Sequence, residues 1–371
     1  MTVEAAPTQQ FTCNGKFFDV LGLAFKNIFL TILTLSLYRF WARSSMRRRV
    51  WSRIWIMGDP LEYTGTPWEL FRGFLIGLPC FFFPAVFVYY IAPLMFEPPT
   101  AALLGFCFYL IGVPLVNAAR FWMRRYQLSR TRWRGIRLAL VGSGWGFAVA
   151  SSGWTVLETL SLGWYGPVAR MNRAKLMWEQ TRFGDQPFVF VDDGEPLAKG
   201  MWWPFALGWF GLPLSWICAI IVVFIASISA AALHVTAPQL TALGPTILGG
   251  MAFVVILLLM GFFLLLFWAP YDAAAMNRVA SLLEIDGARF RLRAKTFSLW
   301  LITLAGWLLI IPSFGLLAPV AGFLRVRYVF SRLEIVNPPE FARIGQSVVD
   351  GPKAGESLAD AFDLDMGLGI I

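Results

Sequence analysis

Lysine and arginine are missing from four long stretches of this chain: 73–119, 138–169, 200–277 and 296–324. A helix of about 20 mostly apolar residues can cross a bilayer, and each of these stretches is longer than that. The whole chain is 58% hydrophobic and only 14% charged, whereas soluble domains carry roughly 25% charged residues. The pattern therefore predicts a protein that crosses a membrane several times.

Two of the stretches have room for an outward helix and a returning helix. One pair would cover 70–96 and 101–121 and be joined by EPPT, and the other would cover 202–233 and 246–268. Because Lys and Arg concentrate in cytoplasmic loops, the basic clusters that flank both pairs belong in the cytoplasm. We therefore predict four full spans with both connecting loops outside.

Three further apolar segments, 17–41, 138–169 and 296–324, are too short for two crossings, which need about 40 residues. Irregular backbone inside a membrane is tolerated only where protein or water covers it. We favour re-entrant or interfacial segments, with additional full spans as the alternative. The predicted fold class is thus an all-α polytopic membrane protein with seven apolar elements, four of them full spans.

A unit made of a helix end, a basic segment and a short β-hairpin recurs along the chain. Aligning Ala42 with Ala169 brings Arg43 to Arg170 and Trp51 to Trp178. The Asp286-Gly287 pair is a strong signal for a two-residue hairpin turn. We predict five copies that form a cytoplasmic layer; mere connecting loops are the alternative. The copies lie near residues 40–65, 114–141, 167–194, 270–295 and 319–336.

Basic and Trp residues of these units form what we name the basic collar. Its long side chains can reach lipid phosphates, while the Trp rings lie at the level of the head groups. Membrane lipids with anionic head groups are therefore the expected partners, and nucleic acid is not, because no reader motif accompanies the charge. The collar comprises Arg43, Arg47, Arg48, Arg49, Trp51, Arg53, Arg120, Arg124, Arg125, Arg170, Arg173, Trp178, Arg278, Arg325 and Arg327.

The two ends of the chain differ from the membrane domain, which we place at 11–336. Residues 1–10 are polar and are predicted to form a short tail. Residues 337–371 begin with Asn-Pro-Pro and are rich in Gly, Ser and acids, a composition typical of disorder. We predict that this acidic C-terminal tail lies in the cytoplasm.

Three polar residues in apolar surroundings are candidates for an intramembrane site. Glu158 could relay protons or hold a cation, since a charge in a membrane segment is costly and often functional; the alternative is an ion pair with Arg170 or another nearby Arg. Asp272 is expected to pair with Arg278 or to cap a turn, and Asn27 to bond across helices. The chain contains no motif for catalysis, a metal or a cofactor, so we do not expect an enzyme.

Several motifs resemble those of the YjgN-like bacterial inner-membrane proteins: NIFLTILTLSLYRFWARSSMRRRVWSRIW with LEYTGTPWELFRGF, then ETLSLGWYGPVARMNRAKLMWEQTRFGDQPFVF and GESLADAFDLD. The resemblance covers nearly the whole chain and implies a multi-pass inner-membrane protein of unknown function, without catalytic residues to carry over. Leu33 and Glu158 depart from the pattern. Ser36 and Ser161 stand in the TLxL turn where we expect Gly.

Two classes of function remain open. Transport, or the handling of lipids or small solutes, is favoured by the repeated units and by Pro- and Gly-interrupted apolar segments, because broken helices often form substrate sites. The alternative is a membrane scaffold or regulator that binds anionic lipid and partner proteins through the basic collar. The sequence does not predict an oligomeric state.

Overall fold

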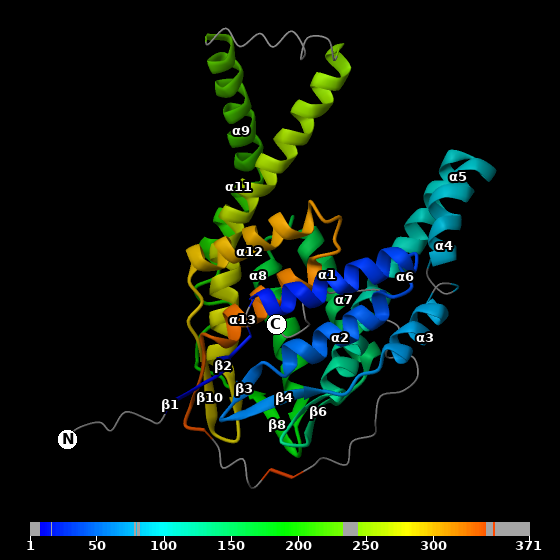
Figure 1. Ribbon diagram of the computed structural model, residues 1–371. Helices are drawn as coiled ribbons and strands as arrows, with labels where there is room; N and C mark the ends of the chain where they lie inside the picture. Colours follow the sequence, from blue (N-terminus) through cyan, green and yellow to red (C-terminus); the bar gives the residue numbers. More distant parts are fainter. Residues whose placement is uncertain are drawn as a thin grey trace.

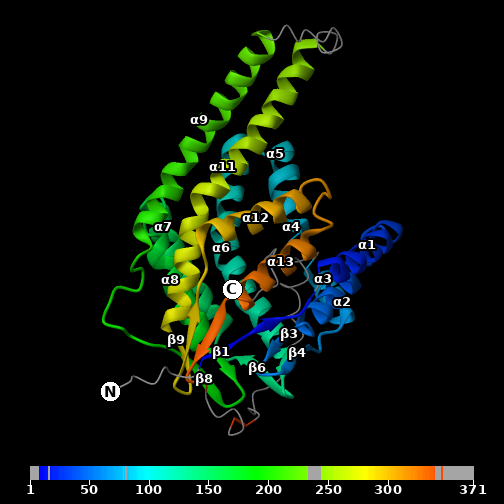
Figure 2. The same cartoon turned by 60° about the vertical axis from the view of Figure 1, so that its left-hand side comes forward.

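The computed structural model describes residues 8–15, 17–77, 79, 82–232, 244–338 and 344–345 (Figure 1). Strands gather at one end, helices cover them, and two long helices project beyond the rest (Figures 1 and 2). The helices are α1 (Phe17–Leu33), α2 (Arg39–Trp51), α3 (Pro67–Gly77), α4 (Phe83–Val86), the π-helix η2 (Phe87–Ile91), α5 (Ala92–Met95), α6 (Pro98–Ser129), α7 (Gly144–Leu160), α8 (Gly166–Glu179), α9 (Trp202–Ala232), α11 (Gly244–Leu282), α12 (Thr296–Ile310) and α13 (Ala318–Phe330).

The strands form one antiparallel sheet in the order β1-β11-β10-β9-β8-β7-β6-β5-β4-β3-β2. They are β1 (Thr8–Gln10), β2 (Thr12–Cys13), β3 (Ile54–Ile56), β4 (Asp59–Tyr63), β5 (Thr131–Trp133), β6 (Ile136–Leu140), β7 (Thr181–Phe183), β8 (Gln186–Phe190), β9 (Leu283–Ile285), β10 (Ala288–Leu292) and β11 (Leu333–Val336). The short hairpins are thus present, but the prediction of an all-α protein is wrong, because neighbouring hairpins also pair with one another.

Four hairpins in the described chain have the same form, a three-residue strand followed by a five-residue strand. A two-residue turn joins the strands, and the left-handed backbone that such turns favour is adopted by Asp286 (φ 47°) and Gly287 (φ 79°). The hairpin turn predicted at this pair is confirmed. Each hairpin follows the end of a helix: α2, α6, α8 or α11.

The N-terminal strand closes the sheet on itself. Only Phe11 separates β1 from β2, yet β1 pairs with β11 and β2 pairs with β3, at opposite edges of the sheet. The strands therefore form a closed ring, which we name the strand ring. The prediction of a polar tail over 1–10 is wrong for Thr8–Gln10, because the backbone of these polar residues completes the unpaired edge of β11.

The inside of the strand ring is apolar and its outside is polar. Where neighbouring hairpins meet, the paired residues that face the core are Leu61 with Trp133, Leu138 with Phe183, Phe188 with Ile285, and Phe290 with Ile335. The next residue along each strand points the other way, and Glu62 with Arg132 is one such pair. This alternation fixes the register, because a slip by one residue would turn the apolar set outward.

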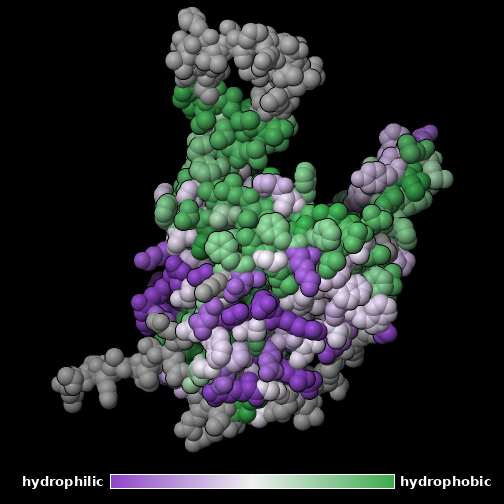
Figure 3. All heavy atoms as spheres, in the orientation of Figure 1, coloured by the Kyte–Doolittle hydropathy of each residue, from purple (hydrophilic) through white to green (hydrophobic). Residues whose placement is uncertain are grey.

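Three described helices are long and apolar enough to cross a membrane: Pro98–Ser129, Trp202–Ile225 and Phe253–Leu282. They overlap three of the four predicted spans, 101–121, 202–233 and 246–268. The fourth, 70–96, is not described as one long α-helix: α3 ends at Gly77, and α4, η2 and α5 follow one another without a gap from Phe83 to Met95. A local change from α- to π-type hydrogen bonding at η2 separates the two short α-helices α4 and α5. Figure 3 shows hydrophobic residues over the projecting helices and hydrophilic residues toward the strand end.

The three segments with too few residues for two crossings form helical hairpins: α1–α2, α7–α8 and α12–α13. Their first helices have 17, 17 and 15 residues, or about 23–26 Å, which is less than the ~30 Å of a hydrocarbon core. Each second helix leads back to the sheet. The turns present apolar side chains outward: Leu35 is 90% exposed and Phe314 is 95% exposed.

All three turns share one hydrogen-bond pattern. A hydroxyl oxygen accepts from the N–H four residues later, as Ser161 Oγ does from Tyr165 (2.8 Å), and Thr34 and Ser313 act alike. Gly163 N–H donates to the Glu158 carbonyl (2.7 Å), and Ser36 and Gly315 make the corresponding bonds. Ser36 has φ 72°, a conformation that favours glycine. Ser161 has φ −88°, so its backbone conformation does not require glycine.

Four residues of the predicted C-terminal tail are described, 337, 338, 344 and 345, and the last two contact the strand ring. The Gly345 carbonyl accepts a hydrogen bond from the Asp185 N–H (3.1 Å) at the β7–β8 turn, and Ile344 is 6% exposed. Disorder from residue 337 onward is therefore wrong for Ile344 and Gly345, because the apolar side chain packs into the core. Residues 339–343 and 346–371 lie outside the described residues.

Candidate functional site

A cavity of about 700 Å³ lies inside the strand ring, and we name it the ring cavity. Its strand side is lined by the apolar residues that face inward, among them Trp133, Phe183 and Phe290. The helices α6, α8, α11 and α13 cover the other side, so the cavity lies between the sheet and the membrane helices. This volume falls within the roughly 300–1,000 Å³ range of small-molecule sites.

Four arginines supply the charge of the ring cavity: Arg120 and Arg124 from α6, and Arg170 and Arg173 from α8. Among the described residues that line the cavity there is no Asp, Glu, Lys or His. The Arg124 guanidinium lies over the ring of Trp178, 5.2 Å from its centroid. An apolar cavity with cationic groups on one side is suited to an anion that carries an apolar chain.

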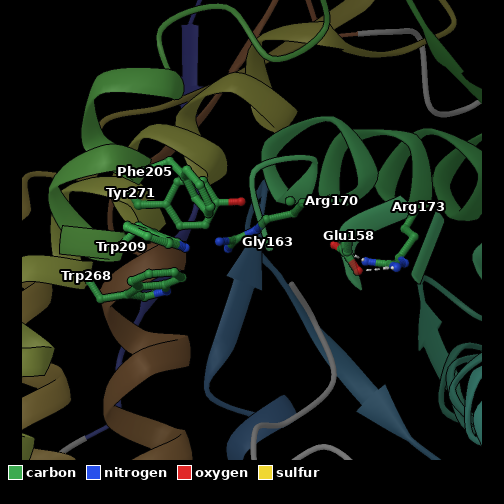
Figure 4. Close-up of a pocket in the computed structure, with 9 residues that line it drawn as sticks. Glu158, Gly163, Arg170, Arg173, Phe205, Trp209, Trp268 and Tyr271 are labelled. Atoms are coloured by element: carbon green, nitrogen blue, oxygen red, sulfur yellow. Dashed lines mark hydrogen bonds and ion pairs between the residues drawn. The ribbon is translucent and has the colours of Figure 1, made fainter. Parts of the chain in front are cut away.

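A second hollow of about 400 Å³ adjoins the first, and we name it the side pocket. It lies where the α7–α8 turn meets α9 and α11, and Gly163 and Gly166 come from the turn (Figure 4). Arg170 and Arg173 line both spaces. These two side chains therefore stand at the boundary between the side pocket and the ring cavity.

Each boundary arginine is held by a carboxylate. Arg173 donates two hydrogen bonds to Glu158, at 2.9 and 2.8 Å, and the two side chains are 22% and 25% exposed. Arg170 donates one bond of 2.8 Å to Asp272. Burial lowers the pKa of Arg170, but Asp272 and Tyr271 favour the charged form more strongly, so its pKa is raised overall and the charge is retained.

These pairs differ from the partners expected from the sequence. Asp272 contacts Arg170 and not Arg278. The Arg278 guanidinium instead donates two hydrogen bonds to the Asp193 carboxylate, at 2.6 and 3.0 Å. Glu158 has Arg173 as its partner. The expected ion pair of Glu158 with a nearby arginine is thus the arrangement observed, while the alternative of a proton relay is not tested by it.

Aromatic side chains make the other wall of the side pocket. Phe205 and Trp268 each contact the ring of Tyr271, with centroids 5.3 Å apart (Figure 4). Trp209 Nε1 donates to the Leu162 carbonyl (3.0 Å), which ties α9 to the α7–α8 turn. The sequence analysis missed this group; its signal was the Trp and Tyr at the ends of two apolar runs, where membrane interfaces favour such residues.

The structure divides the basic collar into three sets. Those that line the ring cavity are Trp51, Arg120, Arg124, Arg170, Arg173 and Trp178. Those held within the protein are Arg47, Arg53 and Arg278. Those directed to the surface or partly exposed are Arg43, Arg48, Arg49, Arg125, Arg325 and Arg327.

Two members of the collar cannot contact lipid head groups as predicted. Trp51 is only 4% exposed because its indole Nε1 donates to Thr131 Oγ1 (3.0 Å) inside the protein. Arg47 is 3% exposed, and its guanidinium donates to the Tyr63 hydroxyl (3.3 Å). In both cases the short basic helix α2 turns these side chains toward the strand ring.

Asn27 links two helices. Its Nδ2 donates to Ser45 Oγ (3.2 Å) and to the Ala42 carbonyl (3.4 Å), both in α2. Asn277 similarly joins α11 to the end of β10 through Ala294, at 2.8 and 2.9 Å. Neither faces the two hollows, so Asn27 is placed outside the candidate site.

Metal-binding chemistry finds no support in the described ranges, where no group of three or more His, Cys, Asp or Glu side chains is close enough to hold an ion. No curated protein and no solved structure matches the chain. A family model described as a bacterial protein of unknown function (DUF898) matches residues 8–361. The chain therefore belongs to this family, the YjgN family whose motifs its sequence resembles.

Proposed function

We propose that this chain is a bacterial inner-membrane protein that binds a single-chain anionic amphiphile, such as a fatty acid, in the ring cavity. The observation that supports this proposal most strongly is the lining of that cavity, which consists of apolar strand residues on one side and includes four arginines. An acyl chain would replace water along the apolar wall, at about 25 cal/mol per Å² buried. A carboxylate or phosphate head would accept charge-assisted hydrogen bonds from the guanidinium groups.

The same proposal gives the protein an orientation. The strand ring would lie in the cytoplasm, because the basic residues cluster around it. From Trp209 to Ala232, α9 would cover about 35 Å, enough for one crossing. The three helical hairpins would enter the cytoplasmic leaflet and return, which the exposed apolar residues at their turns support. Lipid in that leaflet would then lie next to the ring cavity.

We also propose that the strand ring arises from five repeated units. The equal lengths of four hairpins and their common register support this proposal. The fifth unit contributes only β11, and the N-terminal strand takes the place of its missing partner. This arrangement explains why the fifth copy, near residues 319–336, has the weakest hairpin pattern in the sequence.

The proposal is tested by measuring ligand binding to the purified full-length protein in neutral-lipid nanodiscs. A fluorescent fatty acid should bind with saturation, whereas a fluorescent alcohol of the same chain length should bind much more weakly. The double substitution Arg120→Gln, Arg124→Gln should reduce affinity for the acid at least about tenfold, because two cationic donors are lost.

Arg289→Gln with Arg291→Gln is the matched control, since it removes the same charge from β10, whose Arg289 and Arg291 do not line the cavity. Affinity for the acid should not change in this control. Equal binding of acid and alcohol, or an equal loss in both double variants, would contradict the proposal. Lipid extracted from the freshly purified protein and analysed by mass spectrometry should contain a co-purifying acidic amphiphile.

A scaffold that binds anionic head groups is the second candidate, and the exposed residues Arg48, Arg49, Arg325 and Arg327 favour it. These side chains could attract an anionic leaflet at about 1 kcal/mol each. Replacing all four by Gln should weaken attachment of anionic lipid in the surrounding bilayer without changing fatty-acid binding. If this variant loses its partner proteins in cell membranes, and the wild type binds no fatty acid in the ring cavity, the scaffold is favoured over the first proposal.

A further inference from the structure

We infer that the side pocket is a head-group site through which the anionic amphiphile passes sideways between the cytoplasmic leaflet and the ring cavity. This inference rests on the proposed function, and it adds the route and the residues that line it. The side pocket adjoins the ring cavity through Arg170 and Arg173, which line both spaces. A ligand that leaves one space therefore meets the same two guanidinium groups in the other.

The depth of the side pocket matches that of lipid head groups. Trp209 on α9 and Trp268 with Tyr271 on α11 stand where the apolar parts of these helices meet the polar strand end. Trp and Tyr favour this level of a membrane because their rings are apolar and carry a polar group. The α7–α8 turn, whose Leu162 is 77% exposed, lies beside them. The side pocket thus lies where a lipid phosphate or carboxylate would lie.

The charges of the two spaces differ in a way that permits passage. In the side pocket Arg173 is matched by Glu158, and Arg170 by Asp272, so neither guanidinium is a strong trap for an anion. In the ring cavity the same two side chains are joined by Arg120 and Arg124, and no acid is among the described lining residues. An anionic head in the side pocket would therefore meet guanidinium groups whose charge carboxylates already share, and it could leave that pocket readily.

Glycine keeps the route open. A Cβ at Gly166 would lie 3.3 Å from Phe205 Cε2, so a larger side chain there would fill the space between the turn and α9. At Gly153, on α7, no atom lies within 4 Å of an added Cβ. The same substitution at the two positions thus adds equal bulk to one helical hairpin, but it obstructs the side pocket only at position 166.

The test measures the rate and the extent of uptake separately. Full-length protein in phosphatidylcholine vesicles is mixed with a fluorescent fatty acid and, in a parallel series, a fluorescent lysophosphatidic acid. Gly166→Leu should slow uptake and release of either ligand about tenfold, or about 1.4 kcal/mol of barrier, with an unchanged dissociation constant. Gly153→Leu should match the wild type. Uptake of one ligand alone would identify carboxylate or phosphate as the head group.

Equal rates in the two Leu variants would overturn the side pocket as the route and leave binding in the ring cavity intact. An absence of binding in the wild type would overturn the proposed function itself. If Gly166→Leu does not fold, a photo-crosslinking residue at Trp209 gives a second measurement. Its crosslinking to labelled fatty acid should be saturable, whereas crosslinking at Trp216, further along α9, should not; saturation at neither position would overturn the inference.

Discussion

The helical hairpins α1–α2 and α7–α8 have the same turn but different links between their two helices. In α1–α2 the link is neutral, with Asn27 bonded to Ser45. In α7–α8 it is the ion pair of Arg173 with Glu158. Ser36 and Gly163 occupy the same left-handed position in the two turns. Counted from that position, the places of Glu158 and Arg173 are taken in α1–α2 by Thr31 and Met46.

This difference shows that a helical hairpin with this turn forms without an ion pair between its two helices. A neutral link holds one hairpin, and charged groups are costly to bury even when paired. In α12–α13 the corresponding positions hold Ile310 and Arg325, so a third combination also supports the turn. The pair of Glu158 with Arg173 is therefore a property of α7–α8, where the side pocket adjoins the ring cavity, and not of the hairpin fold.

The largest expected effect comes from breaking this ion pair on one side. Arg173→Met should destabilise the protein by about 2–3 kcal/mol, because it leaves the Glu158 carboxylate largely buried without its cation. Reversible unfolding in mixed micelles measures the change. Adding Glu158→Thr, which copies α1–α2, should recover most of the lost stability. A double variant no more stable than Arg173→Met would show that the ion pair is required by the hairpin.

The next effect concerns the left-handed position of each turn. Gly163→Ser should cost about 1–2 kcal/mol, since Gly163 has φ 91° and a Cβ is disfavoured there. Ser36→Gly should have the opposite sign and stabilise α1–α2, by about 1 kcal/mol or less. The same unfolding measurement compares them. If both substitutions change the free energy of unfolding in the same direction, the left-handed position does not have the same preference for glycine in the two turns.

A smaller effect should be equal in all three helical hairpins. Replacing the turn hydroxyl, as in Thr34→Ala, Ser161→Ala or Ser313→Ala, removes the acceptor of one backbone N–H and should cost about 1 kcal/mol each. Three separate unfolding curves give the values. A much larger cost at Ser161 alone would indicate that α7–α8 depends on its turn in a way that the other two do not.

The smallest expected effect concerns an ion pair whose carboxylate is more exposed than the one in α7–α8, that of Arg278 on α11 with Asp193. The hydrogen bond from Arg278 lowers the pKa of Asp193 to about 2. A lowered carboxyl pKa stabilises the fold above the ordinary value near 4, and this contribution is lost as the pH falls from about 4 to 2. The protection of residues 191–201 against hydrogen exchange, measured relative to the intrinsic exchange rate at each pH, should therefore fall over that range. Asp193→Asn should remove this pH dependence, and an unchanged dependence would exclude Asp193 as its source.

Local patterns in the sequence predicted the local parts of the fold. The Asp286-Gly287 turn could be predicted because its chemistry lies in two adjacent residues. The spans within α6, α9 and α11 could be predicted from apolar length. The π-helix η2 within 70–96 was missed, because apolar length alone does not register a local change in the hydrogen-bond pattern of a helix.

The candidate site depends on contacts that no local pattern reveals. Glu158 stood out as an acid in an apolar segment, but its partner follows from the angle at which α8 returns after the turn. Trp51 looked like an interfacial residue because the sequence does not tell which side of the short helix faces the strand ring. The ring cavity itself requires pairing between hairpins far apart in the chain, and sequence spacing contains no measure of that register.

Closure of the strand ring by β1 and β2 sets an order for biosynthesis. β1 is made more than 300 residues before β11, and it must wait for that strand before the two can pair. Until then the N–H and C=O groups of β1 lack their partner strand, and such open edges attract foreign strands. Residues 8–10 are thus the last part of the strand ring to find their place, and a bulky fusion directly before Thr8 would act on assembly rather than on the finished molecule.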